Sequence, residues 1–130
     1  MVSPILPHAD RNLILTGYTG PNQPAIGREV AEKLQLRFLD FETEIEARTG
    51  YSSDVLREQF GERRLRTVEA EIMEEISLRR RTLVRISGHV LLHGDHYDRL
   101  RETGPVICLV ARLDAVLSRL HVLLGARYHD

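Results

Sequence analysis

The sequence predicts an α/β fold in which a parallel sheet of about four strands lies between two layers of helices. Short apolar runs alternate with amphipathic segments of helical periodicity, an order typical of parallel sheets covered on both faces. The first run, residues 12–16, is nearly all apolar, as in a strand buried on both faces. A loop containing glycines joins this run to the next helix. Together these observations predict a three-layer α/β/α domain.

Length and composition indicate one domain. The chain has 130 residues, which suits a single domain over 12–130 preceded by a loose lead-in over 1–11. A formal net charge of −1 argues against nucleic acid or an anionic membrane as partner. Neither a signal peptide nor a bilayer-spanning segment is recognisable, so we expect a soluble, cytoplasmic protein. Cys108, the single cysteine, lies in the stretch VICLV and is expected to be buried.

The amino-terminal half is predicted to contain two strands and two helices. Residues 24–36 follow the glycine loop as a helix, and Pro24 suits its first turn, where a missing N–H costs little. The apolar face of this helix is predicted to consist of Ile26, Val30, Ala31 and Leu34. Residues 37–41 form a second strand that ends at an acid, and residues 42–49 form a short helix followed by Gly50.

The second half begins with two helices and then returns to alternation. A helix over 54–60 can be capped by Ser52 or Ser53. The longest helix covers 62–81 and ends on the run Arg79–Arg81, an order that the helix dipole favours. Its predicted core face is Leu65, Val68, Ile72, Met73 and Ile76. The remaining predicted elements are a strand over 82–87, a helix over 94–103, a strand over 105–111 and a helix over 113–124.

Polar or small residues follow three of the predicted strands. They are the loop after Thr16, the acids Asp40 and Glu42, and the stretch Ser87–His89 after Ile86. Ligands of parallel α/β sheets bind at the carboxyl ends of the strands. The sequence therefore predicts a ligand site at this edge of the sheet.

From Asn12 to about Leu120 the chain resembles shikimate kinase, a P-loop kinase. The family's loop, G-x-x-G-x-G-K-[ST]-x-x-G-[RK], falls on residues 17–28, and its D-x-D falls on Asp40-Phe41-Glu42. Its triple glycine falls on Ser87-Gly88-His89. A further stretch of spaced family residues falls on Glu46, Gly50, Ser52, Phe60, Gly61, Glu62, Leu65, Arg66 and Glu69. No single motif is intact, but their serial order and spacing are specific.

The resemblance implies a nucleoside monophosphate kinase-like fold with strand order 2-3-1-4. It also implies transfer of a phosphoryl group from ATP, with Mg²⁺, to shikimate, a step of aromatic amino acid biosynthesis. The family continues through a lid, a fifth strand and a final helix. Because the sequence stops where that lid begins, we expect an incomplete carboxyl-terminal part, with Arg127 as the candidate lid arginine.

The loop departs from the family at its chemical positions. Asn22 replaces a glycine, Gln23 replaces the lysine that meets the phosphates, and Pro24 replaces the hydroxyl that binds Mg²⁺. The only lysine of the chain, Lys33, lies more than two helical turns away. Losing the lysine and the hydroxyl should cost on the order of 10⁴-fold in rate. By resemblance, the nucleotide-binding residues of this degenerate loop would be Gly17, Gly20, Asn22, Gln23 and Ala25.

The acceptor side matches the family better. By resemblance Asp40 would act near Mg²⁺, as catalytic residue and metal ligand, and Glu42 would contact a shikimate hydroxyl. Arg66 would pair with the substrate carboxylate, a role that suits arginine. Gly88, His89 and Arg127 would complete the substrate pocket.

Plainer interpretations stand beside these. The glycine loop is also compatible with a simple strand–helix turn, and the acids Asp40 and Glu42 with helix amino-terminal positions. Arg66 has Glu62 and Glu69 within helical reach. A zinc site is an outside alternative, because its candidates His89, His93, Asp95 and His96 lack a standard ligand spacing.

Three functional hypotheses follow. The first is a kinase-like protein with a decayed loop, which binds a ligand or a protein partner, or forms a homo-oligomer, instead of turning over ATP. The second is an active small-molecule kinase that uses Arg28 or a lid arginine in place of the lysine. The third is a protein that has lost the nucleotide but keeps a shikimate-like ligand through Arg66 and Glu42.

Overall fold

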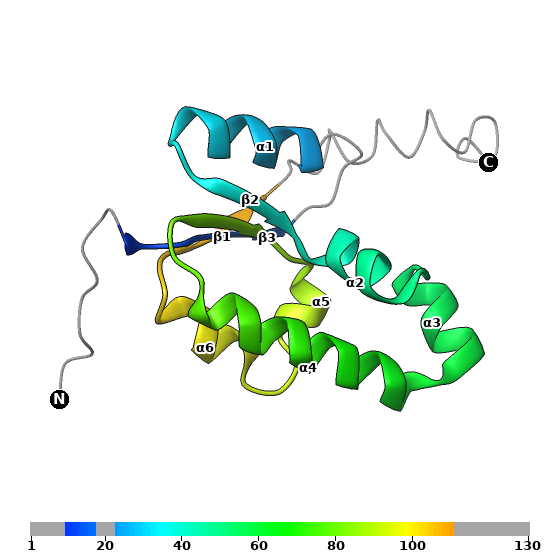
Figure 1. Cartoon of the computed structure of the whole chain (residues 1–130). Helices are drawn as coiled ribbons and strands as arrows, with labels where there is room; N and C mark the ends of the chain where they lie inside the picture. The colour runs from blue at the N-terminus through cyan, green and yellow to red at the C-terminus, as the bar shows by residue number, and fades with distance from the viewer. Residues whose placement is uncertain (1–9, 18–22, 111–130) are drawn as a thin grey trace, which may run out of the picture.

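A computed structural model describes residues 10–17 and 23–110 (Figure 1). The strands of the sheet are β1 (Leu13–Gly17), β2 (Arg37–Asp40), β3 (Thr82–Arg85) and β4 (Val106–Leu109). The helices are α1 (Gln23–Lys33), α2 (Phe41–Thr49), α3 (Ser53–Phe60), α4 (Glu62–Leu78), α5 (Gly88–Leu91) and α6 (His96–Arg101). All neighbouring strands are parallel, in the order β2-β3-β1-β4. The predicted fold class and strand order are both confirmed.

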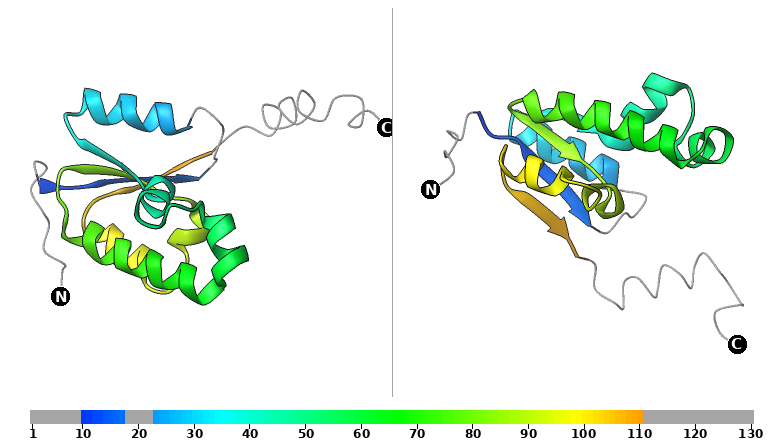
Figure 2. Two further views of the ribbon diagram at one scale, coloured as in Figure 1. Left: turned by 45° about the vertical axis from the view of Figure 1, so that its right-hand side comes forward. Right: turned by 90° about the horizontal axis from the view of Figure 1, so that it is seen from below.

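The sheet separates two unequal hydrophobic cores. Helix α1 lies alone on one face, while α4, α5 and α6 lie on the other, as Figures 1 and 2 show. Ile14 of β1 belongs to the larger core on the α4 side, whereas its neighbour Leu15 belongs to the smaller core with Ala31 of α1. Successive side chains of a strand point to opposite faces, which explains why this run is apolar at consecutive positions.

Helix α4 packs on the sheet as its periodicity predicts. The predicted core residues Leu65, Val68, Ile72, Met73 and Ile76 are all buried. The helix ends at Leu78, and Arg79 already has an extended backbone. The prediction that the helix continues through Arg81 is therefore wrong, because Arg81 has a left-handed φ of 59° in the turn into β3.

The predicted apolar face of α1 is only partly correct. Ala31 is buried, but Ile26 and Leu34 are 43% and 56% exposed. Gly27 is buried instead and lies against the ring of Phe38 in β2. Two small residues four positions apart, Gly27 and Ala31, thus let the helix approach the sheet closely, and Val30 packs against the same small core.

Two further predictions are corrected near the carboxyl half. The short helix α5 was not expected from the sequence; the Ser87 hydroxyl caps it by accepting from the Val90 N–H (3.3 Å). Cys108 is exposed, not buried, because β4 is the last strand in the sheet order among the described residues. The predicted helix over 113–124 lies outside the described residues.

Asn12 joins three segments at the amino end of the sheet. Its Oδ1 accepts from the Thr82 N–H (3.1 Å), its Nδ2 donates to the Arg79 carbonyl (2.9 Å), and its N–H donates to the Thr103 carbonyl (2.9 Å). The side chain is buried. The amino end of the sheet is therefore closed by a satisfied polar network. Within the described residues, no helix combines the length and apolar character required to cross a membrane.

Candidate functional site

Strand β1 ends at a glycine that its surroundings require. Gly17 ends β1 with a φ of 104°, and a Cβ there would lie 2.3 Å from the Leu109 carbonyl oxygen of β4. Glycine is thus required at this position by backbone conformation and by the approach of β4. The prediction that Gly17 contributes to a turn has a clear structural basis, while its contact with a nucleotide stays a prediction.

Asp40 caps helix α2. Its Oδ1 accepts from the N–H groups of Glu42 (3.0 Å) and Thr43 (3.3 Å), which satisfies two donors that every helix start leaves open. Its Oδ2 lies 3.5 Å from Nη1 of Arg85. Both oxygens of this buried carboxylate are therefore engaged by the protein itself.

Arg85 is a buried cation in the interior strand β3. Its side chain is 10% exposed, and its Nε and Nη1 have no hydrogen-bond partner in the described part of the chain. Buried polar groups almost always have partners, so this guanidinium is exceptional. In the strand register Arg85 lies directly beside Asp40 on one side and Leu15 on the other.

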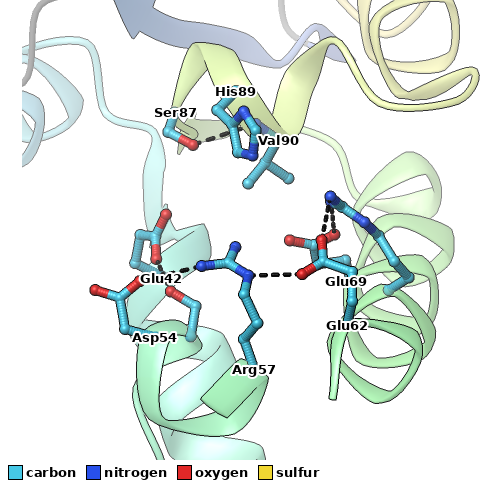
Figure 3. Close-up of a pocket in the computed structure, with 10 residues that line it drawn as sticks. Glu42, Asp54, Arg57, Glu62, Glu69, Ser87, His89 and Val90 are labelled. Atoms are coloured by element: carbon cyan, nitrogen blue, oxygen red, sulfur yellow. Dashed lines mark hydrogen bonds and ion pairs between the residues drawn. The ribbon is translucent and has the colours of Figure 1, made fainter.

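A pocket of about 390 Å³ opens on the α4 side of the sheet, among α2, α3, α4 and α5 (Figure 3). This volume falls within the range of small-molecule sites. Its lining is mostly polar and contains two more acids than arginines. The lining residues are Glu42, Ser53, Asp54, Arg57, Glu62, Arg66, Glu69, Ser87, His89 and Val90.

Glu62 connects two arginines in this pocket. Its Oε2 accepts from Arg57 Nε (2.7 Å), and its Oε1 accepts from Arg66 Nη2. Arg66 also donates from Nη1 to the buried Glu69 (3.0 Å). The hydrogen bond from Arg57 holds the pKa of Glu62 below its ordinary value and raises the pKa of Arg57. Glu62 is therefore ionised at neutral pH.

The remaining walls come from α2 and from the end of β3. Glu42 accepts a hydrogen bond from the Ser53 hydroxyl (2.9 Å). His89 faces the pocket and contacts His93 edge to face, with 4.8 Å between ring centroids. Burial, followed by the nearby charge of Arg66, lowers the pKa of His93. In the described part of the chain no three His, Cys, Asp or Glu residues gather as a metal site.

The structure brings some of the predicted residues together and separates others. Glu42, Arg66 and His89 line one pocket, whereas Asp40 does not line it. Gly88 starts α5, and a Cβ there would lie 3.8 Å from the Thr16 hydroxyl. Of the predicted loop residues, Gln23 and Ala25 belong to the first turn of α1. Gly17 ends β1, and Gly20, Asn22 and Arg127 lie outside the described residues.

Sequence reasoning missed Arg57 and Arg85. Arg57 had a usable signal, because it follows Ser53 and Asp54 by about one helical turn and so shares their face of α3. Arg85 had only the oddity of a charge inside the apolar run TLVRIS.

Comparison with known proteins places this geometry in a family. The sequence model of the family described as shikimate kinase matches residues 24–123. The chain belongs to the shikimate kinase family. Two relatives are shikimate kinases of Caldicellulosiruptor bescii, 32% identical over 110 residues, and Xanthomonas campestris pv. campestris, 35% identical over 109 residues. Those matches cover 85% and 84% of this chain but only 64% and 61% of the relatives, so the chain spans less than two thirds of their length.

Solved shikimate kinases share the fold. The structure from Bacteroides thetaiotaomicron superposes with a TM-score of 0.78 at 26% identity, over 93% of this chain and 72% of that one. The structure from Acinetobacter baumannii, solved in complex with shikimate, gives a TM-score of 0.73 at 28% identity, over 89% of this chain and 65% of that one.

The residues of this chain do not fit the Mg·ATP that the shikimate kinase family implies. Mg²⁺ is held by oxygen ligands with near-octahedral geometry, but Asp40 has one oxygen occupied by two N–H groups and the other beside a guanidinium. The positive charge of Arg85 repels a second cation at that place. The loop in turn has Gln23 where the family has its lysine.

Proposed function

We propose that this chain is a shikimate kinase-like protein that binds a small hydroxylated carboxylic acid, with shikimate as the first candidate, and transfers phosphoryl groups weakly or not at all. The pocket on the α4 side of the sheet is its binding site. A ligand-binding or regulatory role is the consequence.

The pocket chemistry is the observation that carries this proposal. Arginine pairs well with a carboxylate, and Arg57 and Arg66 both face the pocket. Carboxylates accept hydrogen bonds from hydroxyl groups, and Glu42 and Glu69 lie in the same lining. A ligand with several hydroxyls and one carboxylate matches both kinds of partner. In this proposal Arg66 pairs with the ligand carboxylate, Glu42 accepts from a ligand hydroxyl, and His89 lines the pocket.

The proposal of weak phosphoryl transfer is supported by the loop before α1 and by Asp40. Phosphoryl transfer depends on positioning and on charge stabilisation. Gln23, Asn22 and Pro24 lack the groups that supply these in the loop, and Asp40 is tied to its helix and to Arg85. A catalytic role of Asp40, a protein partner or homo-oligomer, and a cytoplasmic location all stay predictions.

Titration with shikimate tests the binding role. Shikimate at a hundred times its Kd is expected to stabilise the protein by about 2.7 kcal/mol, seen as a rise in the melting temperature. The variant Arg66→Met should lose this rise, while Arg80→Met, which removes an exposed arginine from the α4–β3 turn, should keep it. Robust ADP release from Mg·ATP and shikimate would show an active kinase and contradict the second half of the proposal.

Glu62→Gln is expected to strengthen carboxylate binding. Glu62 is a carboxylate held between Arg57 and Arg66, so it competes with the carboxylate of a ligand. Neutralising it should increase the affinity for shikimate by about 1.5-fold to fivefold, the range expected for a partly exposed ion pair. Calorimetric titration measures the effect, with Glu58→Gln on the exposed side of α3 as the matched control. An unchanged or weaker affinity would mean that Glu62 serves only to position the arginines.

A further inference from the structure

The Asp40–Arg85 pair lies away from the pocket proposed above. Phe38 and Leu83 face α1 in the smaller core, and Asp40 and Arg85 follow them by two residues in their strands. Side chains two apart share a face, so the pair lies on the α1 side of the sheet. It stands at the carboxyl ends of β2 and β3, the edge where parallel sheets bind ligands.

The Asp40–Arg85 pair lacks the hydrogen bonds that a purely structural buried ion pair normally has. The Nη1–Oδ2 separation of 3.5 Å does not form a hydrogen bond, and Nε and Nη1 remain without partners in the described residues. A structural pair in a low-dielectric interior normally has its remaining N–H groups satisfied. The Thr16 hydroxyl is also buried without a partner in those residues, but it points to the α4 side of the sheet, near Gly88, and is not part of this pair.

We propose that Arg85 takes the place of the divalent metal beside Asp40, so that a phosphate-bearing ligand is bound at this edge through the guanidinium and without a metal. The cation beside Asp40 is then part of the chain. Arginine is always protonated and is well suited to phosphate oxygens. Nε and Nη1 are themselves buried, so an oxyanion that binds Arg85 would enter through the exposed tenth of the side chain and then supply partners for these N–H groups.

The test uses inorganic pyrophosphate as the probe. Its binding is measured by calorimetry and by the shift in the melting temperature of the protein. With the wild-type chain we expect the same Kd in EDTA and in excess Mg²⁺, after correction for free pyrophosphate. Arg85→Met should weaken binding at least tenfold in EDTA, and Arg85→Lys should recover part of it. Arg37→Ala removes an exposed arginine at the opposite end of β2 and should have no effect.

Each outcome bears on the inference. Wild-type binding that needs Mg²⁺, no wild-type binding at all, or undiminished binding by Arg85→Met would overturn it. If Arg85→Met does not fold, the comparison of EDTA with Mg²⁺ on the wild-type chain still decides. Shikimate binding is measured separately, so a failure of the acceptor pocket and a failure of this inference give different results.

Discussion

Mg·ATP affinity is expected to rise by about a hundredfold or more when the loop is rebuilt as Asn22→Gly, Gln23→Lys and Pro24→Ser and Arg85 is replaced by Ala in the same chain. The new lysine and hydroxyl restore a phosphate contact and a metal ligand. Charge-assisted contacts contribute about 1.5–3 kcal/mol each, and two of them amount to roughly two to four decades in Kd.

Arg85→Ala is included because the loop alone should not suffice. While Arg85 stays beside Asp40, a metal brought by the nucleotide meets a second cation at the place where it needs the carboxylate. We therefore expect the loop variant with Arg85 intact to gain much less affinity, as measured by calorimetry with Mg·ATP. Combining the loop changes with Arg37→Ala is the matched control. A full gain from the loop changes alone would refute the view that Arg85 stands in for the metal.

Gly104→Ala is expected to be the most damaging small substitution for stability. A Cβ at this position would lie 1.7 Å from the carbonyl oxygen, 2.7 Å from the carbonyl carbon and 3.0 Å from the nitrogen of Asn12. All three are backbone atoms, so no side chain can move aside. We expect a loss of about 4 kcal/mol or more in the free energy of unfolding, in the range of exceptional single substitutions.

Urea denaturation measures this effect. Gly88→Ala is the control, because a Cβ there meets only the Thr16 hydroxyl at 3.8 Å, an ordinary contact, and it should change stability by less than about 1 kcal/mol. Equal stability of the two variants would mean that the approach of Gly104 to Asn12 is not part of the native fold.

The fold was predictable because its signals are local and repeated. The core face of α4 from Leu65 to Ile76 follows helical periodicity, and the continuous apolar character of β1 indicates burial on both faces. Cys108 was mispredicted because an apolar run does not reveal whether its strand is internal, and among the described residues β4 is the last strand of the sheet. In β4 the side chain of Ile107 is also 44% exposed.

The candidate site was predictable only for residues whose spacing along the sequence matches a motif of the family. Glu42, Arg66 and His89 lie in one pocket, as the resemblance to shikimate kinase implies. The Asp40–Arg85 pair joins residues that are far apart in the sequence and depends on the register of β2 against β3. That register is a tertiary property, and no local pattern contains it.

The network at Asn12 has a consequence for where the sheet can move. At that end, Asn12 ties the turn before β3 and the turn before β4 to the start of β1. At the other end, the buried atoms of Thr16 and Arg85 are without partners in the described residues. Opening free energies within one domain follow such differences. We therefore expect the amino end of the sheet to open at a higher free energy than the carboxyl end, where a ligand would bind.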